Sequence, residues 1–269
     1  QILSSNLVSN GDFSQESSQL ITNGDFATDS DWTKGNDANI NDSKAIISST
    51  VGESWVLQSN KLTVGKSYKI TLKVDSVTLE GGFAKFALGT GADANTYNIT
   101  ENGVFNFYFS NISFSSNWIQ VFTNGDASVT IDNISVKEVG QNWTVIGTDA
   151  NNYVEFGDGT ARLKFLNTSP ITTLATSFVM TAGKKYKLTV DVLTVTSGGI
   201  KVDGNGISET FNTPGITTRI INPTGATAIK FYRATANVDI TLNSVSLIEI
   251  TNDTNLPRIN YEGFSYQDS

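Results

Sequence analysis

A stretch of strict alternation between apolar and polar residues occurs twice in the chain. Residues 62–78 read LTVGKSYKITLKVDSVT, and residues 179–196 read VMTAGKKYKLTVDVLTVT. In each copy a turn ending in Gly-Lys precedes a tyrosine, Tyr68 or Tyr186, after which every second residue is apolar. A period of two over this length predicts a half-buried antiparallel strand. The copies lie 118 residues apart (Gly65 to Gly183), about the length of one β-sandwich, so we expect two copies of one domain.

The remaining segments repeat in the same order. Trp143 lies near the start of the second copy, as Trp32 lies near the start of the first. At the end of the second copy, LNSVSLIEI (242–250) matches IDNISVKEV (131–139) at the end of the first. Short strands with Gly- and Asn-rich turns between them are typical of a sandwich. The sequence therefore predicts an all-β chain of two tandem β-sandwich domains. The expected division is an N-terminal extension with a partial repeat (1–19), a first domain (20–139), a second domain (140–250) and an exit segment (251–269).

A shorter duplication lies at the start of the chain. Residues 6–13 read NLVSNGDF and residues 19–26 read QLITNGDF. Each has an Asn-Gly turn and a phenylalanine that can enter a core. Only the second copy leads directly into a full domain. The first is an extra strand, a linker or the residue of another repeat, and the sequence leaves these three alternatives open.

Charge and residue types exclude several classes of function. The formal net charge of −8 argues against nucleic acid or an anionic membrane as a partner. No segment approaches the roughly 20 consecutive apolar residues of a membrane-spanning helix. Because the chain has neither His nor Cys, His-based triads and His or thiolate metal sites are excluded. A glycosidase with two carboxylates remains open on residue types alone. The chain begins at Gln1 without a signal-peptide pattern, so we expect a processed polypeptide or a piece of a longer one.

Four motifs in a fixed order carry a resemblance to a known group of modules. These are LITNGDF, a tryptophan a few residues later, VGKSYKITLKV and the closing IDNISVKEV. Together they resemble the carbohydrate-binding-module-like jelly rolls, which are galactose-binding-like β-sandwiches, and the resemblance covers residues 20–250 in two copies. Such modules occur as accessory parts of glycoside hydrolases and as building blocks of phage tails.

The exit segment adds a second resemblance. Residues 256–263 read LPRINYEG and resemble the LPRIDY-type segment of bacteriophage tail and fibre proteins, with Asn260 where an acidic residue is usual. Together the two resemblances imply a non-catalytic structural or interaction protein of a phage virion, in a tail, fibre or appendage. Its expected partners are other virion proteins, further copies of itself and host glycans. The alternative is a carbohydrate-binding accessory region of a secreted bacterial glycoside hydrolase or adhesin, outside the cell or on its surface.

Carbohydrate modules stack sugars on exposed aromatic rings, because one face of a sugar is apolar while its rim needs polar partners. An alternative interpretation of every such ring is packing in or around the core, which we expect for Trp32 and Trp143. Leu174 and Ile229 stand near the places of Trp55 and Trp118 in the second domain, so one sugar site common to both domains is not expected. The candidates are Trp55, Tyr97, Tyr108 and Trp118 in the first domain, and Tyr153, Tyr232 and Arg233 in the second.

The same resemblance implies a structural calcium between the opening and closing strands. Asp132 matches one usual ligand, but Ala27 stands where an acidic ligand is usual, and Asn243 replaces Asp132 in the second domain. A hard cation needs six or more oxygen ligands, several of them charged. We therefore name Asp132 as the single candidate metal ligand, and assign no other cofactor and no catalytic residue.

Overall fold

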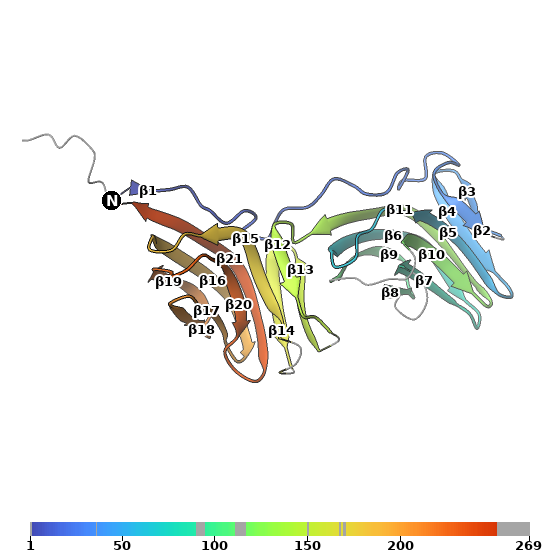
Figure 1. Cartoon of the computed structure of the whole chain (residues 1–269). Coiled ribbons are helices and arrows are strands. Elements are labelled where there is room, and N and C mark those ends of the chain that lie inside the picture. Colours follow the sequence, from blue (N-terminus) through green and yellow to red (C-terminus); the bar gives the residue numbers. More distant parts are fainter. Residues whose placement is uncertain are drawn as a thin grey trace, which may run out of the picture.

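The computed structural model describes residues 2–35, 37–89, 95–110, 117–149, 151–166, 168 and 171–251. Strands, and no helices, form the regular structure of these residues, and they assemble into four antiparallel sheets. The sheets pair into two sandwiches, each with a hydrophobic core of its own (Figure 1). The predicted all-β fold with two sandwich domains is confirmed. Within the described ranges no helix is long and apolar enough to cross a membrane.

The first sandwich consists of two five-stranded sheets, which we name after their central strands. The β10 sheet contains, in spatial order, β2 (Thr33–Gly35), β5 (Glu53–Ser59), β10 (Trp118–Asn124), β7 (Phe83–Leu88) and β8 (Asn95–Ile99). The β11 sheet contains β3 (Asn39–Asn41), β4 (Lys44–Ser49), β11 (Ala127–Val139), β6 (Ser67–Leu79) and β9 (Gly103–Phe109).

The second sandwich repeats this strand order position by position. The β20 sheet contains β12 (Trp143–Ile146), β15 (Thr173–Met180), β20 (Thr227–Arg233), β17 (Ile200–Gly204) and β18 (Ile207–Phe211). The β21 sheet contains β13 (Asn152–Gly157), β14 (Thr160–Phe165), β21 (Val238–Thr251), β16 (Lys185–Ser197) and β19 (Gly215–Ile221). The short β1 (Ile2–Leu3) pairs with the last residues of β21.

The duplicated alternating stretch forms β6 and β16, and its tyrosines are among the largest fully buried side chains. The Tyr68 hydroxyl accepts the Thr63 N–H at 2.8 Å, and the Tyr186 hydroxyl accepts the Thr181 N–H at 2.9 Å. Each bond ties the tyrosine to the turn that precedes its strand. A buried phenol needs such a partner, because an unsatisfied hydroxyl in a core is costly.

Both NGDF copies make the same contacts, but in different sandwiches. Phe26 packs against Trp32 with ring centroids 5.2 Å apart, and Phe13 packs against Trp143 at 5.0 Å. The indole N–H of Trp32 donates to the Asn23 carbonyl and that of Trp143 to the Asn10 carbonyl, each at 2.8 Å. Both tryptophans are buried, which confirms the expected core packing. The first copy, in the predicted N-terminal extension, thus completes the core of the second sandwich.

The second sandwich is consequently built from two separate parts of the chain, with the first sandwich inserted between them. In Figure 1 the N-terminal segment (blue) starts beside β21 and runs on to the first sandwich. Glu16 then forms an antiparallel bridge with Val139, so the chain enters and leaves the first sandwich at neighbouring points. The Glu16 carboxylate accepts hydrogen bonds from Lys69 at 2.8 Å and from Lys137 at 2.9 Å.

The two sandwiches also touch through side chains of β9 and the turn after β13. The Tyr108 hydroxyl donates to the Asp158 carboxylate at 2.7 Å and accepts the Asp158 N–H at 3.2 Å. Gly157 lies under the Tyr108 ring, since a Cβ there would be about 3.0 Å from a ring carbon. Besides the two covalent links, the first sandwich is therefore held to the rest of the chain by these contacts and by the hydrogen bonds of Glu16.

Candidate functional site

The candidate site begins with two neighbouring strands of the β20 sheet. Along β20, Ile229 and Phe231 are fully buried, so Tyr232, on the alternate side of the strand, points away from the core. Along β17, Ile200 and Val202 are buried, and Lys201 points outward. The register places Lys201 directly opposite Tyr232. The outward face of this sheet therefore presents an aromatic ring beside a lysine.

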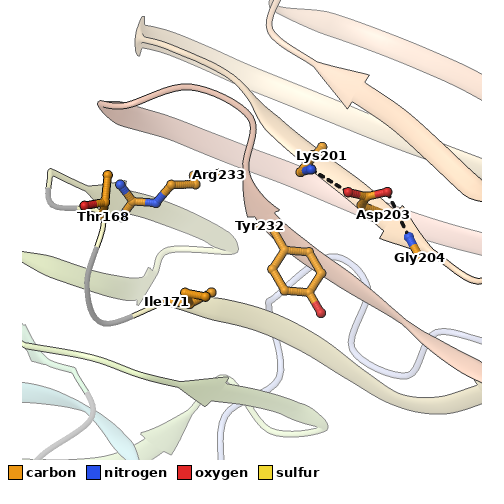
Figure 2. Close-up of a pocket in the computed structure, with 7 residues that line it drawn as sticks. All are labelled: Thr168, Ile171, Lys201, Asp203, Gly204, Tyr232 and Arg233. Atoms are coloured by element: carbon orange, nitrogen blue, oxygen red, sulfur yellow. Dashed lines mark hydrogen bonds and ion pairs between the residues drawn. The ribbon is translucent and has the colours of Figure 1, made fainter.

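A recess of about 520 Å³ opens at this place. Figure 2 shows the Tyr232 ring lying between Ile171 on one side and the Lys201–Asp203 pair on the other. Ile171 is 67% exposed, so the recess has apolar surface besides the ring. The residues that line it are Thr168, Ile171, Lys201, Asp203, Gly204, Tyr232 and Arg233.

The charged pair at one edge of the recess has a fixed arrangement. The Lys201 ammonium donates a hydrogen bond to the Asp203 carboxylate, whose other oxygen accepts the Gly204 N–H at 3.0 Å. The hydrogen bond from Lys201 holds the pKa of the Asp203 carboxyl below its ordinary value. Asp203 is thus an ionised acceptor at neutral pH, which suits it to bind hydroxyl groups and not to donate a proton.

The opposite edge carries Arg233, the last residue of β20. Its guanidinium donates to the Ala236 carbonyl at 3.0 Å and to the Asn152 side-chain oxygen at 3.2 Å. Asn152 is fully buried, and it is held in turn by hydrogen bonds from its backbone and side-chain N–H groups to Asp149. The guanidinium is therefore positioned by neutral acceptors that belong to the sandwich itself.

The tryptophans chosen from the sequence lie on the corresponding face of the first sandwich. Trp55 is directly opposite Phe122 in the register, and Trp118 lies four residues before Phe122 on β10, so the three share the outward face of the β10 sheet. The Trp55 ring lies against Gly35, where a Cβ would be only 2.2 Å away. Trp118 is 38% exposed. Sugar stacking on either tryptophan stays a prediction.

The two tyrosine candidates of the first sandwich have neighbours that occupy their rings. Tyr97 is partly buried and stacks on Phe107, with ring centroids 4.1 Å apart and planes 6° apart. A ring covered in this way does not offer that face to a sugar. Tyr108 makes the contact with Asp158 and Gly157 described above. Both side chains therefore have a structural explanation, as edge packing of the first core and as a link between sandwiches.

Tyr153, the remaining aromatic candidate, lies on β13 of the other sheet, with the Lys164 ammonium 5.9 Å from its ring centroid. It does not line the recess. Of the candidate residues chosen from the sequence, the two that line the recess are Tyr232 and Arg233, which are neighbours in the chain. Sequence reasoning missed Lys201, Asp203 and Ile171. Alternation alone marks Lys201 as outward-facing, but only the strand register shows that it lies opposite Tyr232.

The candidate calcium ligand, Asp132, lies on β11 and forms an ion pair with Lys73. It lines a separate recess of about 440 Å³ together with Asp25 and Lys73. Among the described residues, no group of three or more Asp or Glu side chains could hold a metal ion. The matching Asn243 of the second sandwich donates to Asp191 at 2.8 Å. Calcium at Asp132 stays a prediction.

Comparisons with known proteins return distant similarities. No protein-family model matches the sequence, and neither does any curated protein. Among solved structures, the tandem CBM22 domains of Paenibacillus barcinonensis Xyn10C are 11% identical, cover 88% of this chain and 98% of theirs, and give a TM-score of 0.33. A CBM4 structure is 19% identical over 49% of this chain and 99% of its own, with a TM-score of 0.29.

A fucolectin from striped bass (Morone saxatilis) serum is 13% identical, covers 91% of this chain and 99% of its own, and gives a TM-score of 0.26. Similarities this distant transfer neither a ligand nor an activity to this chain.

Proposed function

We propose that the chain is a non-catalytic carbohydrate-binding protein, and that its second sandwich binds a glycan at the Tyr232 recess. The observation that carries the proposal is an outward-facing aromatic ring in a recess whose rim holds charged hydrogen-bonding groups. A pyranose ring matches this combination, because its C–H face packs on the aromatic ring while its hydroxyls meet Lys201, Asp203 and Arg233.

The absence of catalysis is part of the proposal. Hydrolysis of a glycosidic bond ordinarily needs two carboxyl groups, one of them an acid with a raised pKa. Asp203 is the one carboxylate among the residues that line the recess, and its pKa is lowered by the hydrogen bond from Lys201. We expect the purified chain to leave polysaccharides intact. Turnover that disappears on a single Asp or Glu substitution would contradict this.

The decisive test is a glycan array followed by titration calorimetry, with Tyr232→Ala compared against the unaltered chain. Loss of the ring should weaken binding roughly tenfold or more, because one aromatic contact is worth about 1 kcal/mol beyond the area it buries. Tyr153→Ala is the matched control, since it removes a tyrosine from the other sheet of the same sandwich. Equal binding by all three proteins, or silence across the array, would overturn the proposal.

The outward face of the β10 sheet is a second candidate binding surface, favoured by the exposure of Trp118. Trp118→Ala in the same array separates the two surfaces. We expect the variant to keep the binding that Tyr232→Ala loses. If Trp118→Ala abolishes binding and Tyr232→Ala does not, the glycan site belongs to the first sandwich.

For the biological setting we propose a phage virion, in which the two sandwiches serve as a docking or spacer unit next to other virion proteins. The sequence resemblance of residues 256–263 supports this setting, and these residues lie outside those the structure describes. A secreted enzyme or adhesin is the alternative. Mass spectrometry of purified phage particles and of culture supernatant distinguishes the two settings. In a virion, peptides of this chain should be found in the particles; in a secreted enzyme or adhesin, they should be found among the free secreted proteins.

A further inference from the structure

Arg233 differs from the other arginines of the described chain in its partners. Arg162 makes a bidentate pair with Asp239, both bonds measuring 2.8 Å, and Arg219 pairs with Glu209 at 3.0 Å. For Arg233 the described residues provide no carboxylate within salt-bridge distance. Its guanidinium donates hydrogen bonds to the Ala236 carbonyl and the Asn152 amide oxygen, which are both neutral. The positive charge of Arg233 is thus held in place without being balanced by these partners.

The Arg233 guanidinium also has N–H donors left over for a ligand. A guanidinium has five N–H donors in a planar fork, and the two bonds to neutral acceptors occupy two of them. The fork matches a carboxylate better than any neutral group does, and a positioned side chain loses less entropy when it binds one. Arg233 is half-buried and lines the same recess as Tyr232.

The balance of charge around the recess points the same way. The recess is lined by two positively charged residues, Lys201 and Arg233, and by one carboxylate, that of Asp203. Lys230 adds a further exposed positive charge, because it lies two residues before Tyr232 on β20 and therefore on the same face of the sheet. This local excess of positive charge occurs in a chain whose formal net charge is −8. A negatively charged ligand is attracted to this site and repelled by the chain as a whole.

From these observations we infer that the Tyr232 recess binds an acidic sugar, with the sugar ring against Tyr232 and its carboxylate at the Arg233 guanidinium. The inference rests on the proposed function and names the class of glycan. It assigns to Arg233 the selection of charged over neutral sugars, and to Tyr232 the binding of either.

The test uses pairs of glycans that differ at one kind of charged group, titrated into the whole chain. The pairs are oligogalacturonides against their methyl esters, sialyllactose against its methyl ester, and sulfated against unsulfated galactose. We expect the carboxylate form of at least one of the first two pairs to bind about tenfold more tightly than its neutral partner. Arg233→Gln should remove that preference, so that the acidic and the neutral partner of the pair bind with equal affinity.

Arg219→Gln is the matched control, because it removes a guanidinium elsewhere in the same sandwich, and it should keep the preference. Thermal melting of each variant checks its fold. If Arg233→Gln does not fold, Arg233→Lys serves instead, since it keeps the charge but loses the fork, and most of the preference should be lost.

The remaining outcomes all overturn the inference. Equal binding within every pair, or a preference that survives in Arg233→Gln, removes the role of Arg233 while the glycan-binding function stands. A preference confined to the sulfated sugar shows that a carboxylate is not the recognised group. If no glycan of any pair binds, the proposed function fails together with the inference.

Discussion

The two sandwiches share one scaffold, and they differ on one outward face. Each places an aromatic residue directly opposite a lysine: Phe122 opposite Lys85 in the first sandwich, and Tyr232 opposite Lys201 in the second. In the first, the Lys85 ammonium sits 4.7 Å from the Phe83 ring centroid, and Phe83 contacts Phe122 edge-on at 5.9 Å. In the second, Lys201 is bound by Asp203 instead.

Two positions account for this difference. In the aligned registers, Gly199 stands where the first sandwich has Phe83, and Asp203 stands where it has Ala87. Gly199 lacks the ring that the Lys85 ammonium lies over in the first sandwich, and the added carboxylate of Asp203 binds Lys201 instead. On a repeated scaffold the partner of a retained lysine has thus changed through substitutions beside it, without any change of the strands.

The largest expected effect tests whether the two scaffolds are equivalent and separate. Phe13→Ala should destabilise the second sandwich by about 3–5 kcal/mol, because it removes a buried aromatic ring from that core. Phe26→Ala should do the same to the first sandwich. Hydrogen exchange of β21 and β11 reports on each core separately. If either substitution loosens both cores equally, the sandwiches unfold as one unit and the comparison does not hold.

An intermediate effect is expected from acid. The hydrogen bond from Arg162 holds the pKa of the Asp239 carboxyl below its ordinary value, and Ser128 occupies the matching place in the first sandwich. A carboxyl group whose pKa is lower in the folded state than in the unfolded state stabilises the fold. This stabilisation is fully present above the unfolded-state pKa of about 3.9, and it is lost as the pH falls through the folded-state pKa.

The second sandwich should therefore lose this contribution below about pH 4, and Asp239→Asn should lose it at every pH, at a cost of about 1 kcal/mol near neutrality. Melting curves between pH 7 and pH 2 measure the difference between the variant and the unaltered chain. Ser128→Ala is the control in the first sandwich. A difference that does not shrink below pH 4 would contradict the role given to this pair.

The smallest effect concerns the contact between the sandwiches. Tyr108→Phe removes the bonds to Asp158 while keeping the ring that covers Gly157, so it should cost about 0.5–1.5 kcal/mol. Faster hydrogen exchange at the end of β13, with unchanged exchange in β20, is the expected result. Tyr97→Phe serves as a control inside the first sandwich. Unchanged exchange at β13 would show that the covalent links and Glu16 set the contact by themselves.

Much of the fold could be predicted because its signals are local. Alternation around Tyr68 and Tyr186 specifies β-strands and states which side chains are buried, and the repeated order of motifs specifies two sandwiches. The burial of Trp32 and Trp143 follows from their matched positions. These properties depend on the period of a strand and on the burial of apolar groups, which a stretch of about ten residues already contains.

The candidate site could be predicted only in part. Tyr232 and Arg233 were candidates by residue type, and so were Tyr97 and Tyr108. In the structure the Tyr97 ring is stacked on Phe107, and the Tyr108 hydroxyl is bonded to Asp158. Nothing in residue type distinguishes these cases. The recess depends on Lys201 lying opposite Tyr232, and the two are far apart in the chain. A change of register by one residue would turn the lysine into the core.

The sequence by itself determined the strands, their buried faces and the duplication, since each follows from local periodicity. The tertiary structure decided that NLVSNGDF joins the core formed by residues more than a hundred positions later, and that the first sandwich is inserted into the second. It also decided which aromatic rings are covered by neighbouring side chains, as Tyr97 is by Phe107. Both decisions depend on which distant surfaces pack together, and an isolated segment, which can fit either of two equivalent cores, does not contain that information.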